Sequence, residues 1–116
     1  MPDETFRDFV LDQLGQLGDI ACRRMFGSYG LYHDEVFFGI VCQGQLYFKT
    51  DSVTQAAYRQ RGMQPFRPSA RQTLTSYYAV PIDILEYPQQ LTVWARQAIA
   101  CQAAARAAPR RPRRTR

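Results

Sequence analysis

The chain is predicted to adopt an α+β fold in which helices pack against an antiparallel sheet, in the order α-β-β-β-α-β-β-α. Helix-type apolar spacing occurs at both ends of the sequence, and three strand-like segments with very short links occupy residues 22–49. A short helical segment then separates this meander from an extended segment and an alternating strand. A length of 116 residues fits one domain, which we place at residues 1–108.

The first helix is predicted to begin near residue 3 and to be amphipathic. Asp3 is a suitable N-cap because its carboxylate can accept bonds from the first backbone N–H groups, and Gly15 and Gly18 mark the fraying end. The apolar residues recur at three- and four-residue steps: Phe6, Phe9, Val10, Leu14 and Leu17.

The meander follows the first helix. Its first strand is predicted over residues 22–32, with Gly27 and Gly30 inside the pattern as signs of a bulge. The second strand, Val36–Cys42, is so continuously apolar that both of its faces are expected to be covered. Gln43 and Gly44 predict a hairpin turn into the third strand, Gln45–Lys49, because glycine readily adopts a positive φ.

The second half of the domain begins with a short helix. Ser52 and Gln55 fit a capping box, with Val53, Ala56 and Ala57 as its apolar stripe, and Gly62 ends the helix. Two prolines, at positions 65 and 68, place the next segment at a sheet edge, since proline cannot donate to a ladder. Residues 73–80 then alternate as a strand.

The last helix is predicted to start at Pro88 and to stop at Pro109. Residues 109–116 are expected to be a disordered, arginine-rich tail, because they contain no apolar residue that could pack. The buried stripe of the helix is predicted from its spacing: Leu91, Trp94, Ala95, Ala98, Ile99 and Gln102.

Charge and composition argue against a membrane protein, a secreted disulfide-bonded protein and a metalloprotein. The formal net charge is +5, and five arginines lie in the tail, so the body is formally neutral and the basicity is assigned to the tail. No apolar run is long enough to span a membrane and no signal peptide is evident, so we expect a cytoplasmic protein. Three cysteines without a C-x-x-C pair, and a single histidine, predict neither disulfides nor a metal site or cofactor.

Catalytic chemistry is not predicted. The only histidine, His33, lies at a predicted hairpin end beside Asp34 and Glu35, where a solvated turn is the simplest interpretation. Gly27 and Gly30 do not have the spacing of a phosphate-binding loop, and the lysine of such a loop is absent. We therefore expect a protein that is not an enzyme.

Two features remain open to a nucleic-acid interpretation. Seven tyrosines could stack on bases if the sheet exposed them beside arginines, although filling a half-buried sheet face is the simpler explanation. The tail could neutralise up to five phosphates in weak, non-specific binding to nucleic acid, or it could be a passive solubilising terminus. The candidate nucleic-acid contacts are the tail arginines: Arg110, Arg111, Arg113, Arg114 and Arg116.

Several motifs are spaced along this order of elements. They are Arg24-Met25-Phe26-Gly27-x-Tyr29-Gly30-Leu31-Tyr32, Leu46-Tyr47-x-Lys49-x-Asp51, Pro65-Phe66, Tyr77-Tyr78-x-x-Pro81 and Leu91-x-x-Trp94-x-x-x-Ala98. In combination, over about residues 5–106, they resemble the TfoX N-terminal domain family. The resemblance implies a fold similar to the YjbR-like and secretion-chaperone-like arrangement. Glu35 stands where the family usually has a turn glycine.

The resemblance also implies a function. The family is associated with control of natural competence genes in bacteria, together with the cyclic-AMP receptor protein at promoters. We therefore expect a non-enzymatic regulatory module that contacts the transcription machinery or a regulator protein, with Arg24 and Tyr29 as candidate contact residues. The alternatives are a nucleic-acid binder driven by the tail, and a small-ligand or chaperone-like module with a pocket lined by Phe38, Tyr47 and Tyr78. The oligomeric state stays open.

Overall fold

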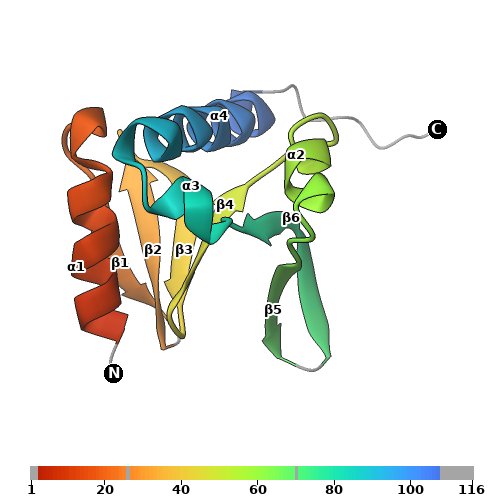
Figure 1. The fold of residues 1–116 in the computed structure, drawn as a ribbon, viewed down its shortest axis with the longest axis horizontal. Coiled ribbons are helices and arrows are strands. Elements are labelled where there is room, and N and C mark those ends of the chain that lie inside the picture. The colour runs from red at the N-terminus through yellow and green to blue at the C-terminus, as the bar shows by residue number, and fades with distance from the viewer. Residues whose placement is uncertain (1–2, 26, 70, 108–116) are drawn as a thin grey trace.

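The structure is a computed structural model that describes residues 3–25, 27–69 and 71–107. One six-stranded antiparallel sheet, in the order β1-β2-β3-β4-β6-β5, carries helices on it, as Figure 1 shows, so the predicted α+β class and element order are confirmed. The elements are α1 (Asp3–Gln13), η1 (Gly15–Leu17), β1 (Ala21–Met25), β2 (Ser28–His33), β3 (Val36–Cys42), β4 (Gln45–Lys49), α2 (Gln55–Gln60), β5 (Pro65–Ser69), β6 (Gln72–Ala79), α3 (Ile82–Leu85) and α4 (Pro88–Ala107).

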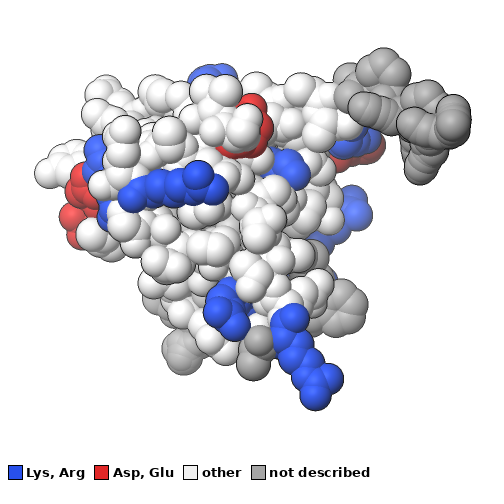
Figure 2. All heavy atoms as spheres, turned by 90° about the vertical axis from the view of Figure 1, so that its right-hand side faces the viewer, with Lys and Arg blue, Asp and Glu red and all other residues white. Residues whose placement is uncertain are grey.

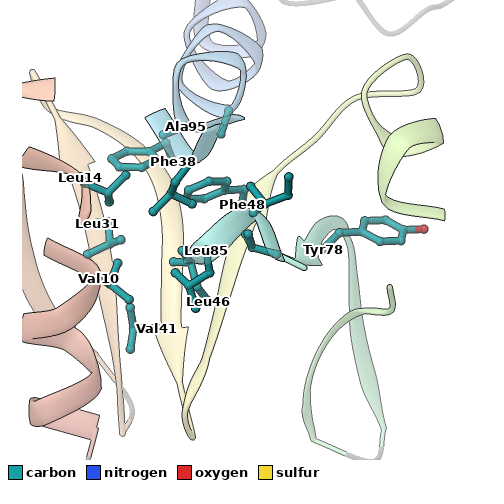
Figure 3. Close-up of a cluster of buried hydrophobic side chains, with 14 of the residues drawn as sticks. Val10, Leu14, Leu31, Phe38, Val41, Leu46, Phe48, Tyr78, Leu85 and Ala95 are labelled. Carbon is teal, nitrogen blue, oxygen red and sulfur yellow. The ribbon is translucent and has the colours of Figure 1, made fainter. Parts of the chain in front are cut away.

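The main core lies between α1, α4 and one face of the sheet. Figure 3 shows Leu14, which directly follows α1, and Leu31, Phe38 and Phe48 from the strands converging beneath α4, and all four are fully buried. Burying a side chain of this size contributes roughly 1.5–3 kcal/mol, so this cluster dominates the stability of the fold. Residues of the predicted α4 stripe are buried too: Leu91, Ala95 and Ala98.

The first predicted strand, residues 22–32, is in fact a hairpin of two strands. β1 and β2 pair antiparallel, with Met25 opposite Ser28. Gly27 has φ +80, a left-handed value that glycine adopts without a Cβ clash, so it serves the turn between the strands and does not form a bulge. The sheet does contain an irregularity in this region, but it lies in the pairing of β2 with β3, between Leu31 and Tyr32.

Two further turns of the meander agree with the sequence prediction. The β2–β3 link has φ +49 at Asp34 and +67 at Glu35, and the β3–β4 link has φ +49 at Gln43 and +76 at Gly44. Positive φ at both central residues is the geometry of the tight hairpin turns whose twist matches the strands. Glu35 therefore occupies a left-handed position without being a glycine.

The start of α2 differs from the predicted capping box. The Asp51 carboxylate accepts bonds from the backbone N–H groups of Val53 and Thr54, at 3.0 and 2.8 Å, and the Asp51 N–H donates to the Thr54 hydroxyl. These bonds lower the pKa of Asp51. Asp51 and Thr54 therefore cap the turn that leads into α2, one residue before the predicted pair, and α2 itself begins at Gln55. Gly62, with φ +75, ends the helix as predicted.

The predicted apolar stripe of α2 is wrong, and that of α1 is corrected at one position. Val53, Ala56 and Ala57 are all exposed, Val53 to 77 %, and α2 instead buries Tyr58, whose ring contacts Trp94 of α4 at 4.7 Å between centroids. On α1, Phe9 is 42 % exposed whereas Val10 is fully buried. The helical period places Val10 towards the sheet, so its neighbour Phe9 points to the side of the helix.

The opposite face of the sheet has a second, smaller core. β5 and β6 form a hairpin whose Phe66 and Tyr77 cover Ile40 of β3. The Tyr47 and Phe66 rings lie 4.6 Å apart, and β6 bends away from β4, as Figure 1 shows. Both faces of β3 are therefore covered, as predicted, and β5 is an edge strand, as its prolines predicted. Tyr47 and Tyr77 fill this face of the sheet, whereas Tyr58 lies on α2 and Tyr87 is 61 % exposed.

Candidate partner-binding surface

Two hollows flank the short helix α3. One has a volume of about 520 Å³ and the other about 660 Å³. Both are bordered by Arg61 and Asp83, so the two hollows adjoin at this pair of residues. We call the region formed by Arg61, Ile82, Asp83 and Tyr87 the α3 surface. The smaller hollow has mostly apolar walls: Phe6, Leu46, Met63, Val80, Pro81, Ile82 and Leu85.

The local sequence explains why α3 presents this surface. Pro81 has φ −61 and ψ 146, an extended conformation, and its carbonyl accepts the N–H bonds of Ile84 and Leu85. Ile84 and Leu85 are each 4 % exposed, and Figure 3 shows Leu85 directed into the core. Because α3 is a single turn whose last two residues are buried, its first residue lies on the opposite side of the turn, in solvent. Ile82 is accordingly 64 % exposed.

An ion pair holds α3 against the end of α2. The Arg61 guanidinium bonds to the Asp83 carboxylate, and it also lies 5.6 Å from the centroid of the Trp94 ring. Both charged side chains are partly exposed, so the pair contributes at most about 1 kcal/mol to stability. Its main effect is on shape, because the paired Arg61 and Asp83 side chains form the border between the two hollows.

The α3 surface combines features of protein contact sites. Ile82 and Tyr87 are 64 % and 61 % exposed, which is unusual for large apolar side chains, and they stand beside concave, partly apolar walls. Arginine and tyrosine are enriched among residues that dominate binding energy at protein interfaces. The arrangement suits an apolar side chain of a partner inserted beside Ile82, with polar groups around it.

The structure brings the two contact residues proposed from the sequence together, as cross-strand partners in the pairing of β1 with β2, but it buries one of them. Arg24 is exposed on β1, whereas Tyr29 is 6 % exposed and belongs to the main core. The guanidinium carbons of Arg7 and Arg24 lie 4.9 and 5.7 Å from the Tyr29 ring centroid, so Tyr29 supports these arginines from below. Neither Arg24 nor Tyr29 lines the hollows around α3. Their role in partner contact stays a prediction.

His33 has a structural role in the described part of the chain. Its Nε2 atom lies 3.2 Å from the Leu17 carbonyl and connects β2 to η1. Within residues 3–107, apart from the gaps at 26 and 70, no group of three or more His, Cys, Asp or Glu side chains could hold a metal ion. None of the described helices combines the length and the apolar character needed to cross a bilayer.

The three cysteines do not form a reactive group. Cys22 and Cys101 are free thiols, and burial raises the pKa of each, which disfavours the thiolate that reacts. Arg7 opposes this effect at Cys22, but burial is the larger influence. The tail arginines proposed as nucleic-acid contacts, at positions 110–116, lie outside the described residues, as does Pro109.

The pocket proposed for a small ligand is filled. Phe38 is fully buried and Tyr78 is 6 % exposed, and both belong to the main core, whereas Tyr47 packs on the other face of the sheet. The α3 surface, in contrast, was missed. A helix of four residues carries no periodic pattern, and the only local signals are Pro81 before it and Pro88 after it.

A family model described as the TfoX N-terminal domain matches residues 12–102, which include the β-meander, α2, the β5–β6 hairpin, α3 and most of α4. The chain belongs to the TfoX N-terminal domain family. The resemblance drawn from the spaced motifs is thereby confirmed.

The chain is similar to two curated proteins, one from Haemophilus influenzae and one from Aliivibrio fischeri. The chain is 32 % identical over 80 residues to the DNA transformation protein TfoX of Haemophilus influenzae, an alignment that covers 66 % of this chain and 36 % of the relative. It is 28 % identical over 74 residues to the DNA transformation protein TfoX1 of Aliivibrio fischeri, covering 64 % of this chain and 34 % of the relative. This TfoX-type domain therefore aligns with about a third of the length of each relative.

Proposed function

We propose that this TfoX-type domain is a non-enzymatic, cytoplasmic regulatory module that acts in bacterial competence by modulating transcription through protein contacts. The observation that carries the proposal is the family match, together with relatives whose names refer to DNA transformation. Two observations support the non-enzymatic part of the proposal: His33, the one histidine of the sequence, lies 3.2 Å from the Leu17 carbonyl through its Nε2 atom, and burial disfavours the reactive thiolates of Cys22 and Cys101. Its partner is a component of the transcription machinery or a regulator protein.

The α3 surface is the contact site that the geometry favours. Ile82 and Tyr87 offer exposed apolar area, and the adjoining hollow has a volume of about 520 Å³, enough for one or two large side chains of a partner. Arg61 and Asp83 stand at its edge, where a polar rim sets the orientation of the partner. The occupant that fits is an apolar segment of a regulator protein.

Deletion of the gene tests the function in the organism itself. We expect the transcripts of competence genes and the frequency of transformation to fall in the deletion strain and to return with the wild-type chain. Affinity capture with this chain should recover a transcription component under the same conditions. An unchanged transcriptome, with no transcription component captured, would refute the proposal.

A further inference from the structure

Charge is unevenly distributed over the folded body. No Asp or Glu occurs between Asp51 and Asp83, and this stretch holds four arginines: Arg59, Arg61, Arg67 and Arg71. Residues 3–19 are the opposite, with one arginine among five acidic residues. The body is neutral in total, as predicted, but its negative charge is concentrated in residues 3–19 and its positive charge in residues 52–82. We predicted that the basic residues would be concentrated in the tail and not on a folded face. The folded body also has a locally basic segment.

The four arginines are on the surface of α2 and of the β5–β6 hairpin. All four are exposed, and Figure 2 views the molecule from the side on which these elements lie, with basic side chains spread over it and few acidic ones. One of the four, Arg61, is engaged with Asp83. The remaining three form, together with Lys49, what we call the basic face.

Uncharged groups hold two cations of the basic face in place. The Arg59 guanidinium donates to the Gln55 side-chain oxygen at 2.9 Å and to the Tyr78 hydroxyl at 3.4 Å. Lys49 Nζ donates to the Ser76 hydroxyl at 3.2 Å and lies 5.4 Å from the Tyr77 ring centroid. Neutral partners orient a cation without cancelling its charge, so both can still attract an anion.

The hairpin adds a shape that suits a nucleic-acid groove. Figure 1 shows β5 and β6 extending from the body as a two-stranded ribbon. A two-stranded ribbon fits the major groove of B-DNA, which is roughly 12 Å wide. Its exposed polar side chains are of the kinds that bond phosphate oxygens: Arg67, Ser69, Arg71, Gln72, Thr73 and Thr75.

We propose that the basic face binds the phosphate backbone of duplex DNA, with the β5–β6 ribbon lying along a groove. The arginines and hydroxyls of the ribbon position the domain on the duplex, and binding is independent of base sequence. The site is distinct from the α3 surface, because none of Lys49, Arg59, Arg67 and Arg71 lines either hollow. Loss of one function therefore leaves the other measurable.

The test is a titration of the full chain into a fluorescent 20-base-pair duplex, followed by anisotropy between 50 and 200 mM salt. The double variant Arg67→Ala/Arg71→Ala removes two cations of the ribbon. Each lost phosphate contact flattens the slope of log affinity against log salt by about 0.9, so a reduction of about 1.8 is expected. The double variant Arg67→Lys/Arg71→Lys keeps both charges and should retain most of the slope.

A matched control removes the same charge elsewhere. Arg23→Ala/Arg96→Ala takes away two exposed arginines, one on β1 at the far edge of the sheet and one on α4. We expect the slope of this control to stay within experimental error of the wild type. All four positions are exposed, so we expect the three double variants to remain folded, and thermal melts of each check this.

Three results would overturn the proposal. Equal weakening by the ribbon and control variants would mean that only net charge matters. A wild-type slope for Arg67→Ala/Arg71→Ala, with binding lost on truncation after Ala107, would assign binding to the tail alone. Equal or tighter binding of a single strand or of an acidic polypeptide, in competition with the duplex, would assign the basic face to that other partner.

Discussion

Gly39 provides the sharpest test of the packing at the centre of the sheet. It lies in β3, and a Cβ atom at this position would stand 3.2 Å from the Tyr47 carbonyl oxygen and 3.3 Å from Cδ1 of Phe48. A third neighbour, Cδ1 of Leu31, would be 3.5 Å away. The substitution Gly39→Ala therefore introduces a methyl group that the surrounding atoms must move to accept.

Two opposing effects determine the magnitude. Alanine in a strand loses less conformational entropy on folding than glycine, which favours the variant by roughly 0.5–1 kcal/mol. Overpacking a filled core typically costs about 1–3 kcal/mol. The Phe48 and Leu31 side chains are both fully buried, and the Tyr47 oxygen belongs to the backbone, so none of the three neighbours can swing into solvent. We expect a net loss of roughly 1–2 kcal/mol.

Urea and thermal unfolding measure this loss directly. For a domain of this size, 1 kcal/mol corresponds to a fall of roughly 4 °C in Tm. Gly15→Ala is the matched control, because nothing lies within 4 Å of its added Cβ and its φ is not positive, so it should be neutral or slightly stabilising. If Gly39→Ala were as stable as Gly15→Ala, the close packing of β3 against β4 described here would be incorrect.

Three further predictions concern turns, a cap and a tyrosine. Glu35→Gly should raise the free energy of unfolding by about 1 kcal/mol in urea titrations, because Glu35 has a left-handed φ of +67. Asp51→Ala should lower Tm whereas Ser52→Ala leaves it unchanged, since the Asp51 carboxylate caps the turn that leads into α2. Burial raises the pKa of Tyr77 to about 12, so the folded state keeps a proton that the unfolded chain releases near pH 10. The contribution of Tyr77 to stability is therefore fully present below pH 10 and is lost between pH 10 and 12 by at most about 1.4 kcal/mol per pH unit, so Tyr77→Phe should make the fall in stability shallower in unfolding titrations.

The sequence correctly predicted those features that depend only on neighbouring residues along the chain. The α4 stripe follows from the helical period, the Gln43–Gly44 turn follows from the left-handed preference of glycine, and the edge position of β5 follows from its two prolines. The family could also be predicted, because its motifs are spread over the whole domain and are specific in combination.

The errors occurred where a distant contact decides between local alternatives. Gly27 fits both a bulge and a turn, and only the pairing of β1 with β2 selects the turn. Ser52 and Asp51 are both good caps, and the position of the first α2 turn selects Asp51. The α3 surface could not be predicted, since it is assembled from the end of α2, α3 and the start of α4.

The central claim is that the chain regulates competence through the α3 surface. The most direct test is to complement a deletion strain with Ile82→Gln or with Val53→Gln, which changes a side chain that is 77 % exposed and lines neither hollow. Transformation frequency and competence transcripts are measured at matched protein levels. We predict that Val53→Gln restores both like the wild type, whereas Ile82→Gln leaves them near the deletion level. Full restoration by Ile82→Gln would contradict the claim.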